Sequence, residues 1–157
     1  QAEAAVAAVR HLLQGDNGGE SLSGLRRAMM DCLEAGAGIY RDKAGLAAAN
    51  SQLAELQERV KAVEVHDRSN VFNTDLTQAL ELRNMLDVAS TVAAAAEARE
   101  ESRGAHQRLD FPQRDDEHFL RHSLVSRSTG GVEVNWRPVT ITRSQPGVRN
   151  YSGKVPA

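Results

Sequence analysis

The sequence predicts a mainly α-helical protein: an antiparallel three-helix bundle with a short N-terminal helix, then a small antiparallel β extension and an extended tail. Over most of residues 1–110, apolar residues recur at steps of three and four, the spacing of a buried helix face. Aromatic residues make up only 4% of the 157 residues, which favours aliphatic helix packing. Beyond Pro112, apolar and polar residues alternate as in strands. We therefore expect residues 1–110 to form the bundle and residues 111–157 to form the extension and tail of one structural domain, packed on the bundle or on a parent protein.

Two helices are expected before residue 40. The first covers residues 1–13 and carries apolar residues at helical spacing, namely Val6, Val9 and Leu12 or Leu13. A glycine-rich breaker at 15–19 ends it. Ser21 can cap the second helix, because its hydroxyl can accept from a free backbone N–H, and this helix should stop near residues 36–38. Its apolar stripe consists of Leu22, Leu25, Met29, Cys32 or Leu33, and Gly36.

Two longer helices follow. Asp42 can cap a helix over residues 43–65, and polar residues 64–74 suit a return loop. The apolar seam of that helix is Leu46, Ala49, Leu53, Leu56, Val60 and Val63. The next helix should run from Thr74 or Asp75 to about Glu101, with the seam Ala79, Leu82, Leu86, Ala89, Ala93 and Ala96. A second stripe beside that seam, formed by Met85, Val88, Val92 and Ala95, predicts a central helix that contacts two neighbours at once.

The C-terminal part is expected to contain short strands. Residues 120–127, 132–136 and 139–142 have the pattern of strands, with 128–131 as a hairpin turn. Pro138 should interrupt continuous pairing, because proline has no N–H to donate. Residues 145–157 are expected to form a tail that needs a partner surface to become ordered.

Charge and composition argue against several classes of function. A formal net charge of −2 provides no positive field for a polyanion, so we expect no nucleic-acid binding. No segment approaches the roughly 20 apolar residues of a membrane span, so no direct membrane insertion is expected. Cys32 is the only cysteine and lies on an apolar stripe, which predicts a buried reduced thiol and suits a reducing cytoplasm. The chain begins at Gln1 within a helical pattern and without Met, so we expect it to be part of a longer protein.

Two patterns suggest ligand sites but are better explained without one. His118 and His122 lie four residues apart beside acidic residues, as for a metal on a helix, but a change from helix to strand is expected there. Gly36 and Gly38 resemble the start of a dinucleotide-binding fingerprint, but Arg41 stands where its third glycine belongs. We therefore expect this chain alone to bind neither a metal nor a flavin.

The most distinctive stretch is residues 101–117, which combine three arginines with three aspartates: Arg103, Arg108, Arg114, Asp110, Asp115 and Asp116. The arginines could clamp a substrate carboxylate, because a guanidinium presents a matching donor fork. Since equal numbers of acids lie beside them, we favour an internally paired network that docks on another surface. His106 could be a general acid or base, but a structural role is the more common one for a lone histidine. Arg103 is expected to be largely solvated, so that its loss affects assembly more than folding.

Several motifs resemble one family. They are Glu-Ser-Arg-Gly-Ala-His at 101–106, Arg-Asp-Asp at 114–116, Val-Phe-Asn-Thr-Asp-Leu at 71–76 and Pro-Gly-Val-Arg-Asn-Tyr at 146–151. These motifs are similar to the C-terminal region of the flavoprotein subunit of fumarate reductase and succinate dehydrogenase, and the last one is most similar to the fumarate reductase branch. The resemblance covers nearly the whole chain. It implies a helical bundle with a β extension, as the residue pattern also predicts.

The resemblance further implies a function within a larger enzyme. It implies an FAD-dependent oxidoreductase that interconverts fumarate and succinate, with FAD in the full-length parent and no catalytic residue in this chain. The implied partners are the flavin-binding domain of the parent, an iron–sulfur subunit and membrane anchor subunits that serve a quinone. The implied location is cytoplasmic, at the inner face of the plasma membrane. The candidate interface residues are Arg103, His106, Arg108, Arg114, Asp115 and Asp116.

Two alternatives stay open from the sequence. The C-terminal domain of L-aspartate oxidase is similar, because it too has a helical domain with a Glu-Ser-Arg-Gly motif. A stand-alone helical interaction module without redox chemistry would also explain the apolar seams. A flavin-binding unit upstream in the same reading frame would separate the enzyme from the module.

Overall fold

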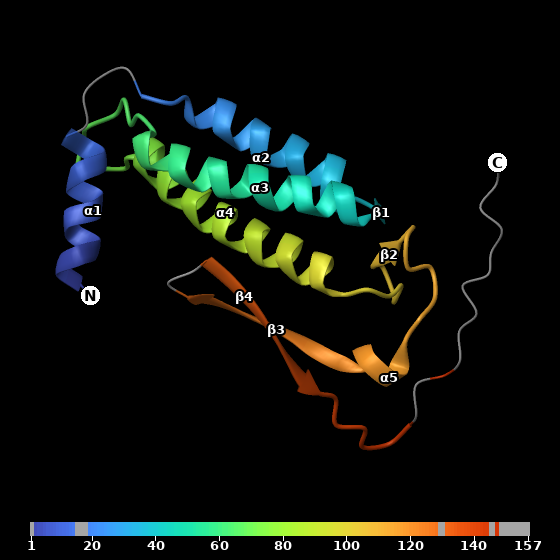
Figure 1. Cartoon of the computed structure of the whole chain (residues 1–157). Helices are drawn as coiled ribbons and strands as arrows, with labels where there is room; N and C mark the ends of the chain where they lie inside the picture. Colours follow the sequence, from blue (N-terminus) through green and yellow to red (C-terminus); the bar gives the residue numbers. More distant parts are fainter. Residues whose placement is uncertain (1, 15–18, 129–130, 145–146, 148–157) are drawn as a thin grey trace.

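The computed structural model describes residues 2–14, 19–128, 131–144 and 147. The molecule is mainly helical, and three long helices pack against one another (Figure 1): α2 (Leu22–Ala37), α3 (Lys43–Arg59) and α4 (Thr74–Ala98). Helix α1 (Ala2–Gln14) lies across one end of this bundle and contacts α4. Among the described residues, no helix combines the length and apolar character that crossing a bilayer requires.

Each long helix begins at a side-chain cap. The Ser21 hydroxyl accepts from the backbone N–H of Gly24 at 3.3 Å, and the Asp42 carboxylate accepts from that of Gly45 at 2.7 Å. Both caps are as predicted. Helix α4 is capped by Asn73, whose side-chain oxygen accepts from the Leu76 N–H at 2.7 Å. Such caps satisfy backbone donors that have no partner within the helix, and each stabilises it by about 1 kcal/mol.

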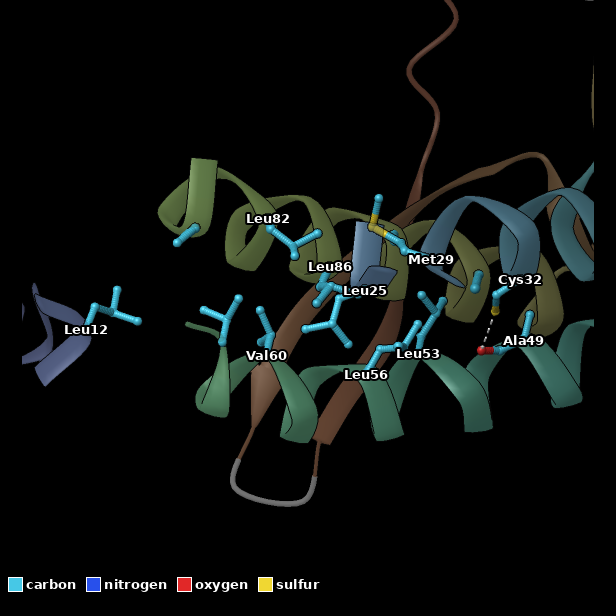
Figure 2. Packing of buried hydrophobic residues seen from close by; sticks show 14 of the residues in the cluster. Leu12, Leu25, Met29, Cys32, Ala49, Leu53, Leu56, Val60, Leu82 and Leu86 are labelled. Atoms are coloured by element: carbon cyan, nitrogen blue, oxygen red, sulfur yellow. Dashed lines mark hydrogen bonds between the residues drawn. The ribbon is translucent and has the colours of Figure 1, made fainter. Parts of the chain in front are cut away.

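The core is aliphatic and lies where the predicted seams meet (Figure 2). Every predicted seam residue of α3 and α4 is buried, and Leu46, Leu53, Leu82 and Leu86 are fully enclosed. Burying a leucine side chain stabilises the fold by about 1.5–3 kcal/mol. Cys32 is buried as expected, and its thiol donates to the Ala49 carbonyl oxygen at 3.5 Å.

Helix α4 contacts both α2 and α3, as its wide apolar arc predicted. Helix α4 does contact more elements than any other, as a central helix should. The described residues cover its second apolar stripe only in part, since Met85, Val88 and Val92 are 38%, 62% and 47% exposed.

Two helices end earlier than predicted. Helix α3 stops at Arg59 rather than near Val65, and a 3₁₀ turn over Val60–Ala62 follows it. The reason is a long-range backbone bridge, in which Glu20 donates to the Ala62 carbonyl and accepts from Glu64. Helix α4 stops at Ala98 rather than near residue 101. The buried side chain of Arg108 binds the last carbonyl groups of this helix.

The strands form two small sheets. β1 (Tyr40–Arg41) pairs in parallel with β2 (Gln107–Arg108), a pairing between distant segments that the sequence did not predict. After the short helix α5 (Asp116–Phe119), β3 (Arg121–Ser128) and β4 (Gly131–Pro138) form the predicted antiparallel hairpin. This hairpin lies along α4, on the side away from α2 (Figure 1).

The predicted third strand at 139–142 is wrong. Those residues are not in a strand and pair with none of the described residues, because the ladder ends at Pro138, which cannot donate the next backbone hydrogen bond. The tip of the hairpin at 129–130 and most of the predicted tail, apart from Gly147, lie outside the described residues.

Candidate functional site

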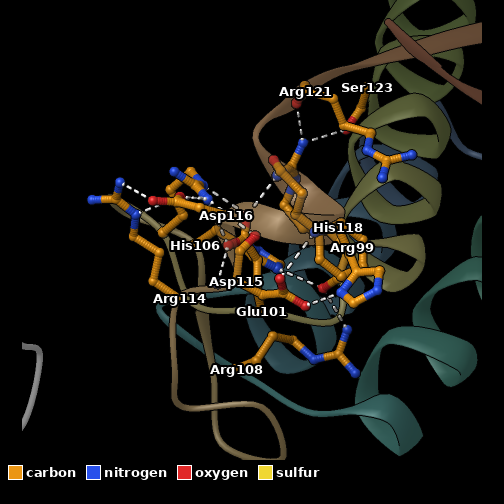
Figure 3. Close-up of polar contacts among 12 residues, drawn as sticks. Arg99, Glu101, His106, Arg108, Arg114, Asp115, Asp116, His118, Arg121 and Ser123 are labelled. Carbon is orange, nitrogen blue, oxygen red and sulfur yellow. Dashed lines mark hydrogen bonds and ion pairs between the residues drawn. The ribbon is translucent and has the colours of Figure 1, made fainter. Parts of the chain in front are cut away.

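The candidate site lies beyond the C-terminus of α4, where the chain folds back towards the start of α3 (Figure 3). Arg103 and His106 exchange two backbone hydrogen bonds of 2.8 and 3.0 Å across a tight turn. Gly104 has φ 60° in this turn, a conformation that is strained for residues with a side chain. Charged side chains fill the surrounding space, and we call them the arginine–carboxylate network: Arg99, Glu101, Arg103, Arg108, Asp110, Arg114 and Asp116.

Glu101 is the buried centre of this network. Its side chain is fully enclosed, yet its carboxylate accepts from Arg99 at 2.6 Å, from Arg103 at 2.7 and 2.9 Å, and from the Asp115 backbone N–H at 2.9 Å. Burial by itself raises the pKa of the Glu101 carboxyl, but the hydrogen bonds from Arg103, Asp115 and Arg99 outweigh burial and lower that pKa. Glu101 is therefore a buried anion held by two guanidinium groups.

Arg108 ends helix α4. Its side chain is fully buried, and its Nη1 donates to the carbonyl oxygens of Ala96, Glu97 and Arg99 at 3.1–3.2 Å. Those carbonyls have no partner within the helix, and a cation is favoured at this negative end of the helix dipole. Arg108 also forms a double hydrogen bond with Asp110, 2.7 Å in both arms, which lowers the pKa of that carboxyl to about 2.

The network joins three separate parts of the molecule. Asp110 accepts from the Lys43 backbone N–H at 3.0 Å and so ties the segment to the start of α3. Arg99 donates to the carbonyl oxygens of Phe119 and Arg121 at 2.8 and 2.7 Å, and its guanidinium lies 5.0 Å from the Trp136 ring centre. The end of the bundle is thereby fixed to α3 on one side and to the β3–β4 hairpin on the other.

His106 is held as one neutral tautomer. Its Nδ1 lies 3.0 Å from Nη1 of Arg41, and its Nε2 lies 3.1 Å from the Arg99 carbonyl oxygen. A guanidinium only donates and a carbonyl only accepts, so Nδ1 is unprotonated and Nε2 carries the proton. Burial lowers the pKa of His106, and the neighbouring charges of Arg41, Arg108 and Arg99 lower it further.

The outer part of the network is also paired. Asp116 binds Arg114 through both oxygens and accepts from Arg103 at 2.6 Å, and these guanidinium groups lower the pKa of Asp116 to about 2. Asp115 caps α5 by accepting from the His118 N–H at 3.0 Å, and this bond lowers the pKa of Asp115. Asp115 also contacts the His118 ring nitrogen at 2.8 Å.

This arrangement offers little for chemistry. The arginines that could have clamped a substrate carboxylate bind protein carboxylates instead, and both nitrogens of His106 are engaged. Within the described ranges, no group of three or more metal-ligating side chains comes together. Gly36, in the last turn of α2, is packed against α3, where an added Cβ would lie 2.4 Å from the Gly45 carbonyl oxygen, so the close approach of the two helices explains this glycine without a bound pyrophosphate.

All six candidate residues from the sequence lie at this end of the molecule. Their partners are residues of the same chain, and these include Arg99 and Glu101, which are not among the six. Sequence reasoning missed Arg99 and Glu101 as its central members. The expectation that Arg103 is largely solvated is wrong, because its side chain is only 26% exposed and its partner Glu101 is fully enclosed. Glu101 does open the Glu-Ser-Arg-Gly-Ala-His motif at 101–106, but the sequence assigned it no partner or role.

The chain resembles known proteins along most of its length. The family model for the fumarate reductase flavoprotein C-terminus matches residues 26–151. The fumarate reductase flavoprotein subunit of Mycobacterium tuberculosis is 51% identical over 143 residues, which cover 90% of this chain and 24% of the relative. The succinate dehydrogenase flavoprotein subunit of Rickettsia conorii is 37% identical over 135 residues, which cover 85% of this chain and 22% of the relative.

Solved structures agree with these matches. A structure of E. coli quinol fumarate reductase superposes with a TM-score of 0.89 at 42% identity, covering 99% of this chain and 27% of that one. This chain thus spans about a quarter of the length of the curated relatives that it matches.

Proposed function

This chain belongs to the fumarate reductase flavoprotein C-terminal family, and we propose that it acts as the C-terminal helical domain of an FAD-dependent flavoprotein subunit that interconverts fumarate and succinate. The observation that carries the proposal is a match that runs through nearly the whole chain, charged end included. The relatives are named as fumarate reductase and succinate dehydrogenase subunits, which favours this function over L-aspartate oxidase and over a stand-alone module.

In this proposal the redox chemistry lies outside the chain. FAD would be held by the flavin-binding domain of the parent and would supply hydride transfer to and from the substrate. The paired charges of residues 99–116 and the close packing of Gly36 on α3 support this division, in which the chain has a supporting role. Residues 1–110 would form the supporting bundle, and residues 111–157 would form the extension that packs on the bundle or on the parent.

The proposed partners follow from the relatives. Related solved structures include a quinol-fumarate reductase with menaquinol molecules, so a quinone-linked complex is the natural setting. We assign to this setting an iron–sulfur subunit and membrane anchor subunits. The subunit that contains this chain would then lie on the cytoplasmic, inner face of the plasma membrane as a peripheral protein.

The arginine–carboxylate network would act in assembly. Its members Arg103, Arg108, Arg114 and Asp116, with His106 and Asp115 beside them, would hold the end of the bundle in a single conformation against which the flavin domain packs. A buried network favours one geometry, because each displaced member leaves a charge without a partner. The network would therefore support flavin binding from outside the flavin site.

A chimaera tests the proposed function. This chain would replace the matching 143 residues of the M. tuberculosis relative. We expect the chimaera to retain FAD and to reduce fumarate with a reduced viologen dye as the electron donor. A matched chimaera with Leu86→Asp, which disrupts the core, should lose both. If the unmodified chimaera folds but contains no FAD and reduces no fumarate, the proposed function is wrong.

A further inference from the structure

A charged pocket of about 500 Å³ lies where the end of α3, helix α4 and the β3–β4 hairpin meet. Its volume is in the range of pockets that hold small ligands. The bases in its walls come from three separate elements, with Lys61 in the turn after α3, Arg83 in α4 and Arg127 in β3. The acids in its walls are Glu58 and Asp87. The described walls therefore carry three positive charges and two negative ones.

Both acids already have partners within the chain. Lys61 donates to Glu58 at 2.5 Å. Asp87 accepts from the Gln57 side chain at 3.0 Å and forms an ion pair with Arg127. These two ion pairs balance two of the three positive charges, so the charge that remains in the pocket is that of Arg83.

Arg83 also has an unused hydrogen-bond donor. Its Nε is buried and has no hydrogen-bond partner among the described residues. A buried donor without a partner destabilises a fold, so such a group in a native structure calls for an explanation. Nε and the neighbouring Nη together form the side of a guanidinium that can bind two oxygens of one carboxylate or phosphate group.

We propose that this pocket binds a small oxyanion, whose carboxylate or phosphate oxygens accept hydrogen bonds from the Arg83 guanidinium. The excess positive charge selects an anion, and the buried Nε gains the partner that it lacks. Because the walls belong to α3, α4 and the hairpin, a bound anion also holds the hairpin against the bundle. This binding is additional to the proposed function and does not depend on it.

Arg26 provides a matched comparison within the same chain. Its Nη2 is likewise buried without a hydrogen-bond partner among the described residues, and it lines a pocket of similar volume, about 430 Å³. That second pocket contains three acids, Glu20, Glu64 and Asp75, beside Arg26 and His66. An anion there would be repelled by the carboxylates, so we expect no binding at Arg26.

Nuclear magnetic resonance of the arginine Nε–H groups in the 157-residue chain tests the proposal directly. Arg83→Gln and Arg26→Gln assign the two signals. The chain is titrated with inorganic phosphate and separately with malonate, at an ionic strength held constant with sodium chloride. We expect the Arg83 signal to move and to saturate with at least one of these anions, while the Arg26 signal stays in place. The anion that binds tells whether the natural ligand carries a phosphate or a carboxylate group.

Isothermal titration calorimetry with the same anions measures the affinity. Arg83→Gln should weaken binding roughly tenfold or more, because it removes both the charge and the donor fork. Arg83→Lys keeps the charge without the fork and should recover only part of the affinity. Arg26→Gln should bind like the unmodified chain. Calorimetry on the M. tuberculosis chimaera with and without Arg83→Gln repeats the test without requiring this chain to fold by itself.

Several results would overturn the proposal. One is an Arg83 signal that moves with neither anion, and another is equal movement at Arg83 and Arg26, which would show a general effect of charge. Binding to the chain that is absent from the chimaera would assign Arg83 to an acidic group elsewhere in the subunit and would also overturn it. FAD content and fumarate reduction in the chimaera report on the proposed function alone, so the two proposals can fail independently.

Discussion

The bundle core and the charged end of this molecule are both buried, but they are stabilised by opposite means. Leu53 and Leu86 in the core are fully enclosed among aliphatic side chains, and Glu101 and Arg108 at the charged end are just as enclosed among charges. Aliphatic burial is non-directional and depends on shape and volume. A buried ion network depends on every partner being in place, because a single unpaired charge costs more than the pair contributes. Substitutions should therefore affect the two regions by different rules.

The largest effect is expected in the core. Leu53→Asp or Leu86→Asp buries an unpaired carboxylate and leaves a cavity, so each should cost more than about 4 kcal/mol and unfold the chain. Circular dichroism melts would show it. Ala54→Asp, at an exposed position on α3, is the matched control and should melt close to the unmodified protein. Native-like melts for the two leucine variants would show that the core is assigned wrongly.

The next effect is expected at Arg108. Arg108→Ala should cost about 3–5 kcal/mol, because it leaves the carbonyls at the end of α4 and the Asp110 carboxylate without their donor. Arg108→Lys should recover little of this, since an ammonium cannot reproduce the guanidinium fork. Urea denaturation of the three proteins would test it. Full recovery by lysine would mean that charge matters here and geometry does not.

These two regions also differ in how far the sequence predicted them. The seams of α3 and α4 and the caps at Ser21 and Asp42 followed from local periodicity and residue type, because both are set within a few residues of the chain. The burial of Glu101 could not be predicted, since it depends on Arg99, Arg103 and the Asp115 backbone meeting around one carboxylate. The sequence shows that these charged residues are present, but it does not show which of them are hydrogen-bonded to one another.

Long-range contacts explain the remaining differences. The β1–β2 pairing joins residues 40–41 to 107–108, and no local pattern encodes such a pair. The early end of α3 has the same cause, because the bridge between Glu20 and Val63 takes up backbone groups that a longer helix would have used. Local reasoning therefore succeeds for the aliphatic core and fails where distant segments share hydrogen bonds.

Arg103 should show a smaller but clear effect. Arg103→Ala removes two of the hydrogen bonds to the enclosed Glu101 carboxylate and leaves those of Arg99 and Asp115, so we expect a loss of about 1–3 kcal/mol. Arg127→Ala is the control, because it breaks an exposed pair with Asp87 and should cost about 0–1 kcal/mol. Thermal melts of both variants give the comparison. Equal losses would mean that the burial of Glu101 carries no energetic weight.

The last effect is expected from acid. The native pKa values of Asp110 and Asp116 are about 2, so their contribution is present above about pH 4 and is lost as the pH falls towards 2. His106 also has a lowered pKa, so the unfolded chain binds its proton first, and stability falls as the pH drops below about 6.5.

His106→Gln separates the two acid effects. It should flatten the decline in melting temperature that begins below about pH 6.5 and leave the steeper loss below about pH 4 unchanged. An unchanged profile in the upper range would show that His106 does not titrate in the way that its contacts with Arg41 and Arg99 require.

We expect the arginine–carboxylate network to support the enzyme without taking part in its chemistry. The most direct measurement is fumarate reduction per bound FAD in the M. tuberculosis chimaera that carries Arg103→Ala, beside its melting temperature and its FAD content. The expected result is a lower melting temperature and less retained FAD, but unchanged turnover for each FAD that remains bound. Unchanged stability and FAD content with a large fall in turnover per FAD would instead place Arg103 in the reaction.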